Sequence, residues 1–440
     1  MNWLNIRKNS KFSRFFNEKK NYDWYLVIIV SLLSLGGIAF LASASSIIST
    51  ARYDSEIYLL IRQVSLGLWI GFVLAFIFSQ FDYHNLYKFR KHLLILSFFF
   101  LGWMAIAEIL YKFHIIAEPE SFRILTIKPI SSNGATRWLE FAPSLRFQPV
   151  EFTKIALLVY VCGYFYKSEN ESKVKQEITF LSLKKELYAI VASLILIIMQ
   201  PDLGSALLVF AVSFGALYIC EVPRKILMSI IAFMIGFVLI SVIPTSNTNG
   251  VNTNYRTGRV QTFINKITGN ATTTTDSNLH TERVEDAIQN GGLWGEGYGN
   301  SQYKKRGLIP EIHTDAIIAV IGEEMGFFKT LIFLALYLIL AIRGLKVATE
   351  APDLFGRGLA AGIVFWITGQ TLLNIMSFLS LTPLSGVPLP FVSYGSTSLL
   401  INLTAMGILI NISSFSKQQS SKTTLNTPRL RTTRPKFTIM

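Results

Sequence analysis

The sequence is poor in cysteine and in charged residues. Its two cysteines, Cys162 and Cys220, fall in apolar runs, which excludes a disulfide framework and a cysteine-based metal site. Charged residues form 15% of the chain, against about 25% in ordinary soluble domains. Hydrophobic residues form 51%, so the composition also excludes a disordered chain and disfavours a soluble enzyme.

Apolar runs of membrane-spanning length recur along the chain. One span takes about 20 residues, so the runs predict an all-α polytopic membrane protein with about ten transmembrane helices. The runs lie at 24–45, 62–80, 92–110, 149–166, 186–199, 203–220, 226–243, 316–342, 358–380 and 397–415. The first ends with Ala42-Ser43-Ala44, like the cleavage site of a secretory signal, but its length predicts a retained helix.

Basic residues mark one side of the predicted membrane protein. The chain carries 41 basic and 27 acidic residues, an excess that indicates membrane topology here and not a nucleic-acid partner. Both tails, 1–23 and 416–440, are basic, so the positive-inside rule puts them in the cytoplasm and 24–415 in the transmembrane domain. The large loop 244–315, between the seventh and eighth predicted helices, then faces outward.

Acidic residues surround the start of the predicted helix 316–342. Asp315 lies at its outer mouth, and Glu323 lies eight residues further, about 12 Å deeper. Ionisable groups at membrane depth indicate a functional site or a buried partner. Alternatively, Asp315 complements the helix dipole, and Glu323 and Glu324 form structural ion pairs.

A second charged pair opens the predicted helix 149–166. Glu151 and Lys154 are three residues apart and therefore neighbours on one helix face. We favour a structural ion pair that lines a polar cavity, because an isolated charge near the bilayer would be costly. Just before it, Arg137 and Trp138 place a cation beside an indole at the outer interface, where Trp138 alternatively serves as a membrane anchor.

Three outward segments contain further candidates for binding. Arg256 and Arg259 are spaced to hold a phosphate, to which forked arginine donors are well suited. Lys304 belongs to a basic cluster that follows the glycine- and aromatic-rich run 291–299. The nearly chargeless segment 382–396, which includes Ser393, has three prolines and two glycines and predicts a re-entrant loop lining a cavity.

Taken together, these segments resemble the SEDS family of cell-wall polymerases, whose members include FtsW and RodA. The matching segments are GATRWLEF at 134–141, QPVEFTK at 148–154, QPDLGSALL at 200–208, NYRTGRVQTF at 254–263, GGLWGEGYGNS at 291–301, LIPEIHTD at 308–315, IGEEMG at 321–326 and PLPFVSYGSTSL at 388–399. Residues 299–304 look more like the division branch, FtsW, than the elongation branch, RodA. Two departures concern the residues after Asp315, which are usually Phe-Ile-Phe, and Ser396, which replaces a usual glycine.

The resemblance implies a polymerase of lipid II at the outer face of the bacterial cytoplasmic membrane. It also implies a class B penicillin-binding transpeptidase and other divisome or elongasome membrane proteins as partners. It implies an essential aspartate at Asp315, a sensitive position at Trp138 and a salt bridge between Glu151 and Lys154.

The chemistry of glycan polymerisation gives the charged residues roles. We expect Asp315 to act as a base toward the acceptor hydroxyl, or to hold a divalent cation, Mg²⁺ or Mn²⁺. We expect Arg137, Arg256 or Arg259 to stabilise the departing pyrophosphate. Lys304 and Ser393 are further candidates for substrate contacts, and no organic cofactor is expected.

Two other functions would fit some of these features. A lipid flippase or transporter would use the same polar cavity and intramembrane charges. The charges cluster on the outer side and no inverted repeat is visible, which favours the polymerase. A scaffold that only organises division enzymes would leave Asp315 unexplained.

A cysteine at position 273 tests the predicted topology. In a Thr273→Cys variant, a membrane-impermeant maleimide should label intact cells, because 244–315 is predicted to face outward. Labelling that occurs only after the membrane is permeabilised would contradict the assignment.

Overall fold

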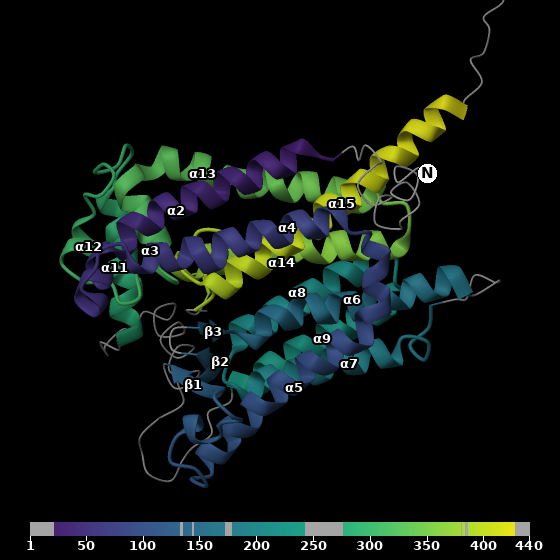
Figure 1. Cartoon of the computed structure of the whole chain (residues 1–440), viewed down its shortest axis with the longest axis horizontal. Coiled ribbons are helices and arrows are strands. Elements are labelled where there is room, and N and C mark those ends of the chain that lie inside the picture. The colour runs from purple at the N-terminus through teal and green to yellow at the C-terminus, as the bar shows by residue number, and fades with distance from the viewer. Residues whose placement is uncertain are drawn as a thin grey trace, which may run out of the picture.

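The computed structural model describes residues 22–132, 135–142, 145–171, 178–242, 276–379, 381–382 and 386–426. Long helices dominate this part of the chain and lie side by side along one axis (Figure 1). The helices are α2 (Trp24–Tyr53), α3 (Tyr58–Arg62), the π-helix η1 (Gln63–Trp69), α4 (Ile70–Gln80), η2 (Tyr83–Asn85), α5 (Leu86–Lys112), η3 (Pro119–Ser121), α6 (Pro149–Glu171), α7 (Lys184–Met199), α8 (Leu203–Ile219), α9 (Arg224–Val242), α11 (Asp276–Asn290), α12 (Gln302–Lys305), α13 (Ile317–Glu350), α14 (Leu354–Phe378) and α15 (Ser396–Asn426).

The helices agree with the apolar runs in the sequence, since each run overlaps one helix or a continuous helical segment. Six segments of the described chain are long and apolar enough to cross a membrane. They are Trp24–Tyr53, Tyr58–Gln80, Tyr83–Lys112, Ile317–Glu350, Leu354–Phe378 and Ser396–Ser416. A mostly helical, multi-pass protein is therefore confirmed, whereas the count of about ten spans and the side that each loop faces stay predictions.

The prediction of an all-α fold is wrong in one region. The loop between α5 and α6 contains a three-stranded antiparallel sheet in the order β1 (Lys128–Ser132), β2 (Ala135–Ala142), β3 (Leu145–Phe147). Leu139 of β2 is buried with Trp103 and Met104 of α5, so the sheet packs on the end of that helix. Strands this short give little periodic signal in the sequence, which explains why the apolar runs did not reveal them.

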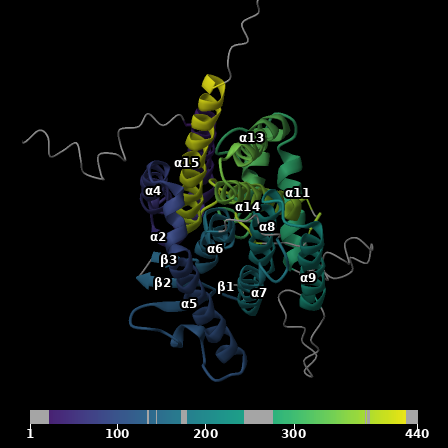
Figure 2. The ribbon, with the colours of Figure 1, turned by 90° about the vertical axis from the view of Figure 1, so that its right-hand side faces the viewer.

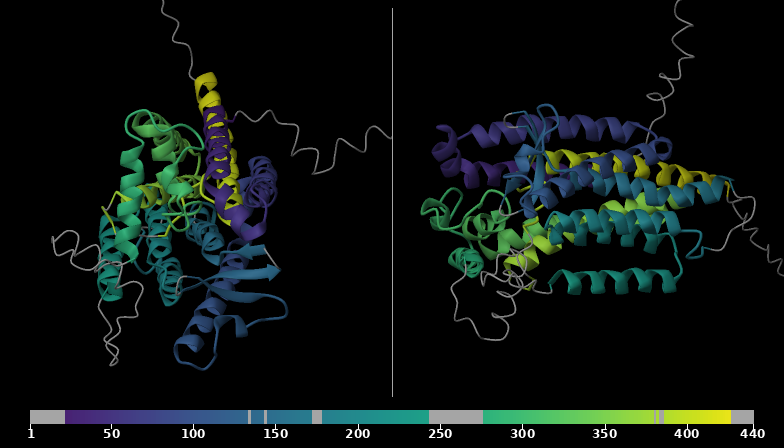
Figure 3. Two further views of the ribbon diagram at one scale, coloured as in Figure 1. Left: turned by 90° about the vertical axis from the view of Figure 1, so that its left-hand side faces the viewer. Right: turned by 90° about the horizontal axis from the view of Figure 1, so that it is seen from below.

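α14 lies at the centre of the bundle. It contacts α6, α8, α13 and α15, and Figure 2 shows it enclosed by them. Small residues such as Gly358 and Gly362 allow the close approach, because a Cβ there would meet side chains of α6. The sheet, α11 and α12 lie at one end of the bundle (Figure 1), as the view from below in Figure 3 also shows. The start of α2 and the end of α15 lie at the opposite end (Figure 1), as an even number of spans requires.

The glycine-rich segment 291–299 packs against a break in α13. Gly326 has φ 75° and ψ 179°, which interrupts the helix. The segment supplies hydrogen bonds there: Glu296 N donates to Glu323 O (2.9 Å), Gly297 N donates to Glu324 O (3.0 Å), and Phe327 N donates to Gly292 O (2.9 Å). Backbone groups freed by the break are therefore paired within the protein.

Replacing Gly326 tests this packing. In Gly326→Ala, a Cβ would overlap the backbone of Trp294 and Gly295 and force an unfavourable φ, so we expect the free energy of unfolding to fall by about 1–3 kcal/mol. The control is Gly102→Ala in α5, where a Cβ meets nothing within 4 Å and stability should be kept. Equal thermal midpoints for the two purified variants would contradict the close contact.

Candidate active site

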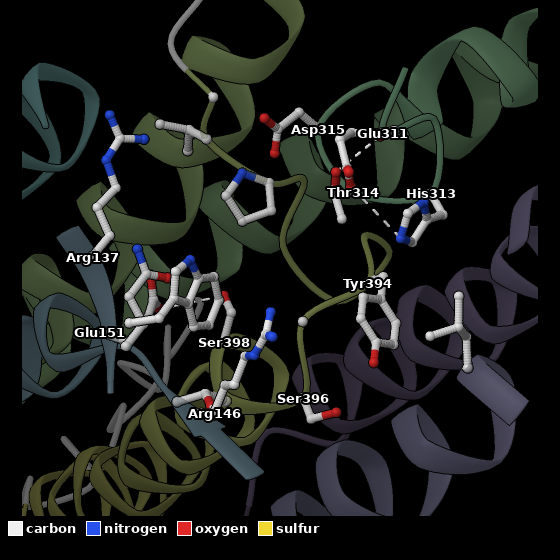
Figure 4. Close-up of a pocket in the computed structure, with 18 of the residues that line it drawn as sticks. Arg137, Arg146, Glu151, Glu311, His313, Thr314, Asp315, Tyr394, Ser396 and Ser398 are labelled. Carbon is white, nitrogen blue, oxygen red and sulfur yellow. Dashed lines mark hydrogen bonds and ion pairs between the residues drawn. The ribbon is translucent and has the colours of Figure 1, made fainter. Parts of the chain in front are cut away.

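A polar pocket of about 520 Å³ lies among segments that are far apart in the sequence (Figure 4). The end of α2, the first residues of α6, α8 and α15, strand β2 and the turn before α13 all contribute to its lining. It thus gathers five of the segments that the sequence analysis singled out: 134–141, 148–154, 200–208, 308–315 and 388–399.

Asp315 lies in the turn that leads into α13. The helix begins at Ile317 and its N-cap residue is Ala316, so Asp315 lies one residue before the N-cap. The side chain of Asp315 is half-buried and lines the pocket. In Figure 4, Asp315 and Arg146 project into the pocket from opposite sides.

Two buried amides of α14 hold the non-helical backbone at the pocket: Asn374 the turn that contains Asp315, and both amides the loop that begins at residue 386. Asn374 Nδ2 donates to the backbone oxygens of Asp315 (3.0 Å) and Val387 (2.8 Å). Gln370 Nε2, one helical turn away, donates to Pro388 O (2.9 Å). The sequence analysis missed both residues; the available signal was two amides four positions apart in an otherwise apolar helix.

Segment 386–396 forms a hydrogen-bonded loop, and its two ends, 386–388 and 394–396, line the pocket. Gln63, the first residue of η1, donates from Nε2 to Ser393 O (3.3 Å) and accepts from Gly395 N (3.1 Å). Tyr394 N donates to His313 O (2.9 Å), which ties the loop to the turn before α13. The hydroxyl of Ser393 accepts from Leu389 N (2.8 Å) and is buried behind the pocket, where it supports the loop.

The predicted pair Glu151–Lys154 is present at the inner wall of the pocket. Lys154 Nζ donates to Glu151 Oε1 (2.9 Å) and Gln370 Oε1 (3.2 Å), and it lies 4.3 Å from the ring centroid of Trp366. Glu151 lines the pocket and accepts from Ser398 Oγ (3.3 Å), whereas Lys154 is fully buried behind it. The charge of Lys154 is therefore paired with Glu151 and further stabilised by Gln370 and the face of Trp366.

Of the other predicted residues, Arg137 and Trp138 line the pocket. Arg137 donates to Pro201 O (2.7 Å), and its Nε lies 3.7 Å from Asp202 Oδ2. Arg256 and Arg259 lie outside the described residues. The expectation for Lys304 is contradicted: it is 6% exposed, and its Nζ contacts Glu324 Oε1 (2.9 Å) and Ser43 Oγ (2.6 Å), so it is not available to a substrate.

Glu323 and Glu324 of α13 both have structural partners. This agrees with the alternative, given in the sequence analysis, that the two glutamates have a structural role. Glu324 accepts from the buried Lys304 and from Ser43. Glu323 accepts from Gln302 N (2.8 Å), Asn290 Nδ2 (2.9 Å) and the hydroxyl of Ser301. These contacts fix the residues on both sides of the glycine-rich segment to α13, and none of them lies in the lining of the pocket.

Three arginines of the pocket were not among the predicted residues. Arg52 lies 3.6 Å from Glu311, and Arg146 lies 3.3 Å from Glu140. Among the described residues, the buried Nε of Arg62 has no hydrogen-bond partner. The signal for Arg146 was its place directly before the segment 148–154; Arg62 gave a weaker one, as a cation at the start of an apolar run.

An apolar groove of about 270 Å³ adjoins the pocket. Both cavities share Arg62, Arg146, Ser396 and Thr397, so the arginines lie at the junction. The rest of the groove is lined by Leu66, Ile70, Phe141, Leu145, Phe147, Leu400 and Ile401. This arrangement suits a ligand with an anionic group beside a long apolar chain.

The remaining ionisable groups bear on charge and on metal binding. Burial lowers the pKa of the His313 imidazole, although the nearby Glu311 carboxylate opposes this. The described residues contain no group of three or more His, Cys, Asp or Glu side chains that could hold a metal ion. The divalent cation stays a prediction, which a chelator added to an activity assay would test.

The chain is similar to proteins of bacterial cell-wall synthesis. A family model for cell cycle proteins, named after FtsW, RodA and SpoVE, matches residues 23–418. The chain is 32% identical to a probable peptidoglycan glycosyltransferase FtsW of Geobacter sulfurreducens, over 90% of this chain and 96% of the relative. It is 30% identical to a protein of the same description from Bacillus subtilis, over 92% and 93% of the two chains.

Solved structures share the fold. A chain in a peptidoglycan synthase complex aligns with a TM-score of 0.66 and 23% identity, covering 90% of this chain and 99% of the other. The rod shape determining protein RodA of Thermus thermophilus aligns with a TM-score of 0.58 and 23% identity, covering 89% and 96%. At such identities the likeness shows the fold alone.

The buried ion pair generates a test of its structural role. Lys154→Met leaves Glu151 unpaired and should lower the free energy of unfolding by about 3–5 kcal/mol. The double variant Glu151→Gln/Lys154→Met removes both charges and should regain most of that stability, measured as thermal midpoints of purified protein. A single variant as stable as the wild type would show that Lys154 is not needed for folding.

Proposed function

The chain belongs to the family of cell cycle proteins that includes FtsW, RodA and SpoVE, and on this basis we propose that its pocket is where glycan strands are made. The chain is a peptidoglycan glycosyltransferase that functions in division or elongation. We propose lipid II as its substrate and the outer face of the bacterial cytoplasmic membrane as its place of action. The observation that carries the proposal is a carboxylate, Asp315, in an arginine-lined pocket beside an apolar groove.

The proposed reaction joins two lipid-linked sugars. The hydroxyl oxygen of the acceptor sugar attacks the anomeric carbon of the donor, a new carbon–oxygen bond forms, and the bond to the pyrophosphate breaks. Asp315 takes the hydroxyl proton as a general base. The lipid pyrophosphate leaves with the electron pair and needs cationic donors around it.

Arg62 and Arg146 are the proposed partners of the pyrophosphate. They lie where the polar pocket meets the apolar groove, so a pyrophosphate between them would have its sugars in the pocket and its lipid in the groove. Guanidinium groups bind such anions through paired donors. Arg137 is less available, because it already contacts Asp202 and Pro201, and we assign it to the wall of the pocket together with Trp138.

The proposal extends to topology and partners. We propose that the helices form about ten spans with both tails in the cytoplasm. A solved relative of this fold belongs to a peptidoglycan synthase complex that couples polymerization to crosslinking. By analogy, we propose a class B penicillin-binding transpeptidase as a partner, with other divisome or elongasome membrane proteins.

A flippase remains the alternative, but the inner wall of the pocket argues against it. A transported lipid headgroup would need a polar route toward the cytoplasmic end of the bundle. Directly behind Glu151, that direction is filled by the buried side chains of Lys154 and Trp366. Opening it would leave the lysine charge without its partners.

The Asp315→Asn variant tests the proposed reaction. It keeps the shape of the side chain and removes the carboxylate, so purified protein mixed with lipid II should fold normally and make no glycan polymer. The control is Glu282→Gln, which removes an exposed carboxylate of α11 and should leave polymerisation unchanged. Substantial polymer from the Asp315→Asn protein would reject a catalytic carboxylate.

A further inference from the structure

Two tyrosines are stacked at the rim of the pocket. Tyr53, the last residue of α2, and Tyr58, the first of α3, have ring centroids 4.2 Å apart and an interplanar angle of 22°. Asp54 ends α2 in a left-handed conformation, with φ 54°, and so begins the short turn that brings the two rings together. Tyr53 lines the pocket and remains 42% exposed, so it presents a supported aromatic surface to whatever binds there.

An exposed ion pair lies in the same pocket. Arg52, the neighbour of Tyr53, has Nη2 3.6 Å from Glu311 Oε1, and the two side chains are 60% and 44% exposed. Such exposed pairs contribute little to stability. Glu311 precedes Asp315 by four residues and both line the pocket, so the pair joins a planar donor next to Tyr53 to a carboxylate acceptor in the segment that leads to the proposed base.

We propose that Tyr53, Arg52 and Glu311 form a carbohydrate subsite for one pyranose ring of the glycan. This inference rests on the proposed function, because it takes the pocket to hold sugars. A pyranose ring has an apolar face of C–H groups, which packs on an aromatic ring, and a rim of hydroxyls that both donate and accept hydrogen bonds. Arg52 supplies donors only and Glu311 acceptors only, so together they match neighbouring hydroxyls.

The subsite complements the other end of the pocket. Arg62 and Arg146 are suited to the pyrophosphate, and the groove beside them to the lipid. Neither the two arginines nor the groove offers an aromatic face to a sugar within the polar pocket. A ring held on Tyr53 would lie beside the turn of Asp315, which is where a sugar hydroxyl must be for its proton to be taken.

A membrane-interface belt is the other role open to exposed tyrosines. A belt needs an amphipathic ring at the bilayer surface, with no requirement for a neighbouring ion pair or for a place in the pocket. It also predicts a different result, because loss of a belt residue would reduce insertion or stability and leave the affinity for a soluble sugar unchanged.

Binding of a soluble glycan tests the subsite without requiring catalysis. The probe is a lipid-free tetrasaccharide of alternating N-acetylglucosamine and N-acetylmuramic acid, titrated against the purified full-length protein by calorimetry. Tyr53→Leu should weaken binding by about three- to tenfold and raise the KM for lipid II by a similar factor, with kcat unchanged. Tyr53→Phe and Tyr53→Trp keep an aromatic face and should retain wild-type affinity.

Tyr111→Leu is the matched control, because Tyr111 is also 42% exposed but does not line the pocket. Its affinity for the tetrasaccharide should equal that of the wild type. Equal affinity of Tyr53→Leu and wild type, or no binding to the wild type, would overturn the subsite even if lipid II is polymerised. Binding that depends on Tyr53 in a protein that makes no polymer would instead reject the proposed function and keep the subsite.

Discussion

The pocket depends on one constraint: non-helical backbone among transmembrane helices must find its hydrogen bonds within the protein. The turn before α13 and the loop 386–396 are both non-helical. Asn374 satisfies the oxygens of Asp315 and Val387, Gln63 satisfies both Ser393 and Gly395, and the Tyr337 hydroxyl donates to Pro390 O (2.5 Å). The same bonds that make the irregular backbone tolerable fix the position of the Asp315 turn.

The inner wall of the pocket also contains polar and charged groups that find their partners within the protein. Lys154 is held by Glu151, Gln370 and the face of Trp366, so these side chains close the inner wall of the pocket. Gln370 also holds Pro388, which joins the ion pair to the loop in a single network through α14. Asp315 and Arg62 both line the pocket, and an anionic group of a substrate would be attracted to the guanidinium of Arg62.

The sequence predicted what local patterns encode. Apolar runs predicted the helices, because each run is a continuous stretch of residues, and the predicted motif that contains Asp315 lies in the lining of the pocket. The sequence did not reveal the sheet at 128–147. It also did not reveal that Asn374 holds the backbone of Asp315 across 59 residues of chain, because such contacts depend on the packing of distant elements. Lys304 was misjudged for the same reason: a basic cluster suggests a binding surface until Glu324 and Ser43 are known to surround its ammonium group.

The central claim is that the lipid-linked sugars occupy the pocket of Asp315 while the lipid follows the adjoining groove. A cryo-electron microscopy structure of the Asp315→Asn protein with lipid II tests it most directly, because removal of the proposed base should leave the substrate bound and unreacted. The account predicts density for the pyrophosphate between Arg62 and Arg146, with sugar density toward Asn at position 315. Headgroup density elsewhere in the bundle, with this pocket empty, would contradict it.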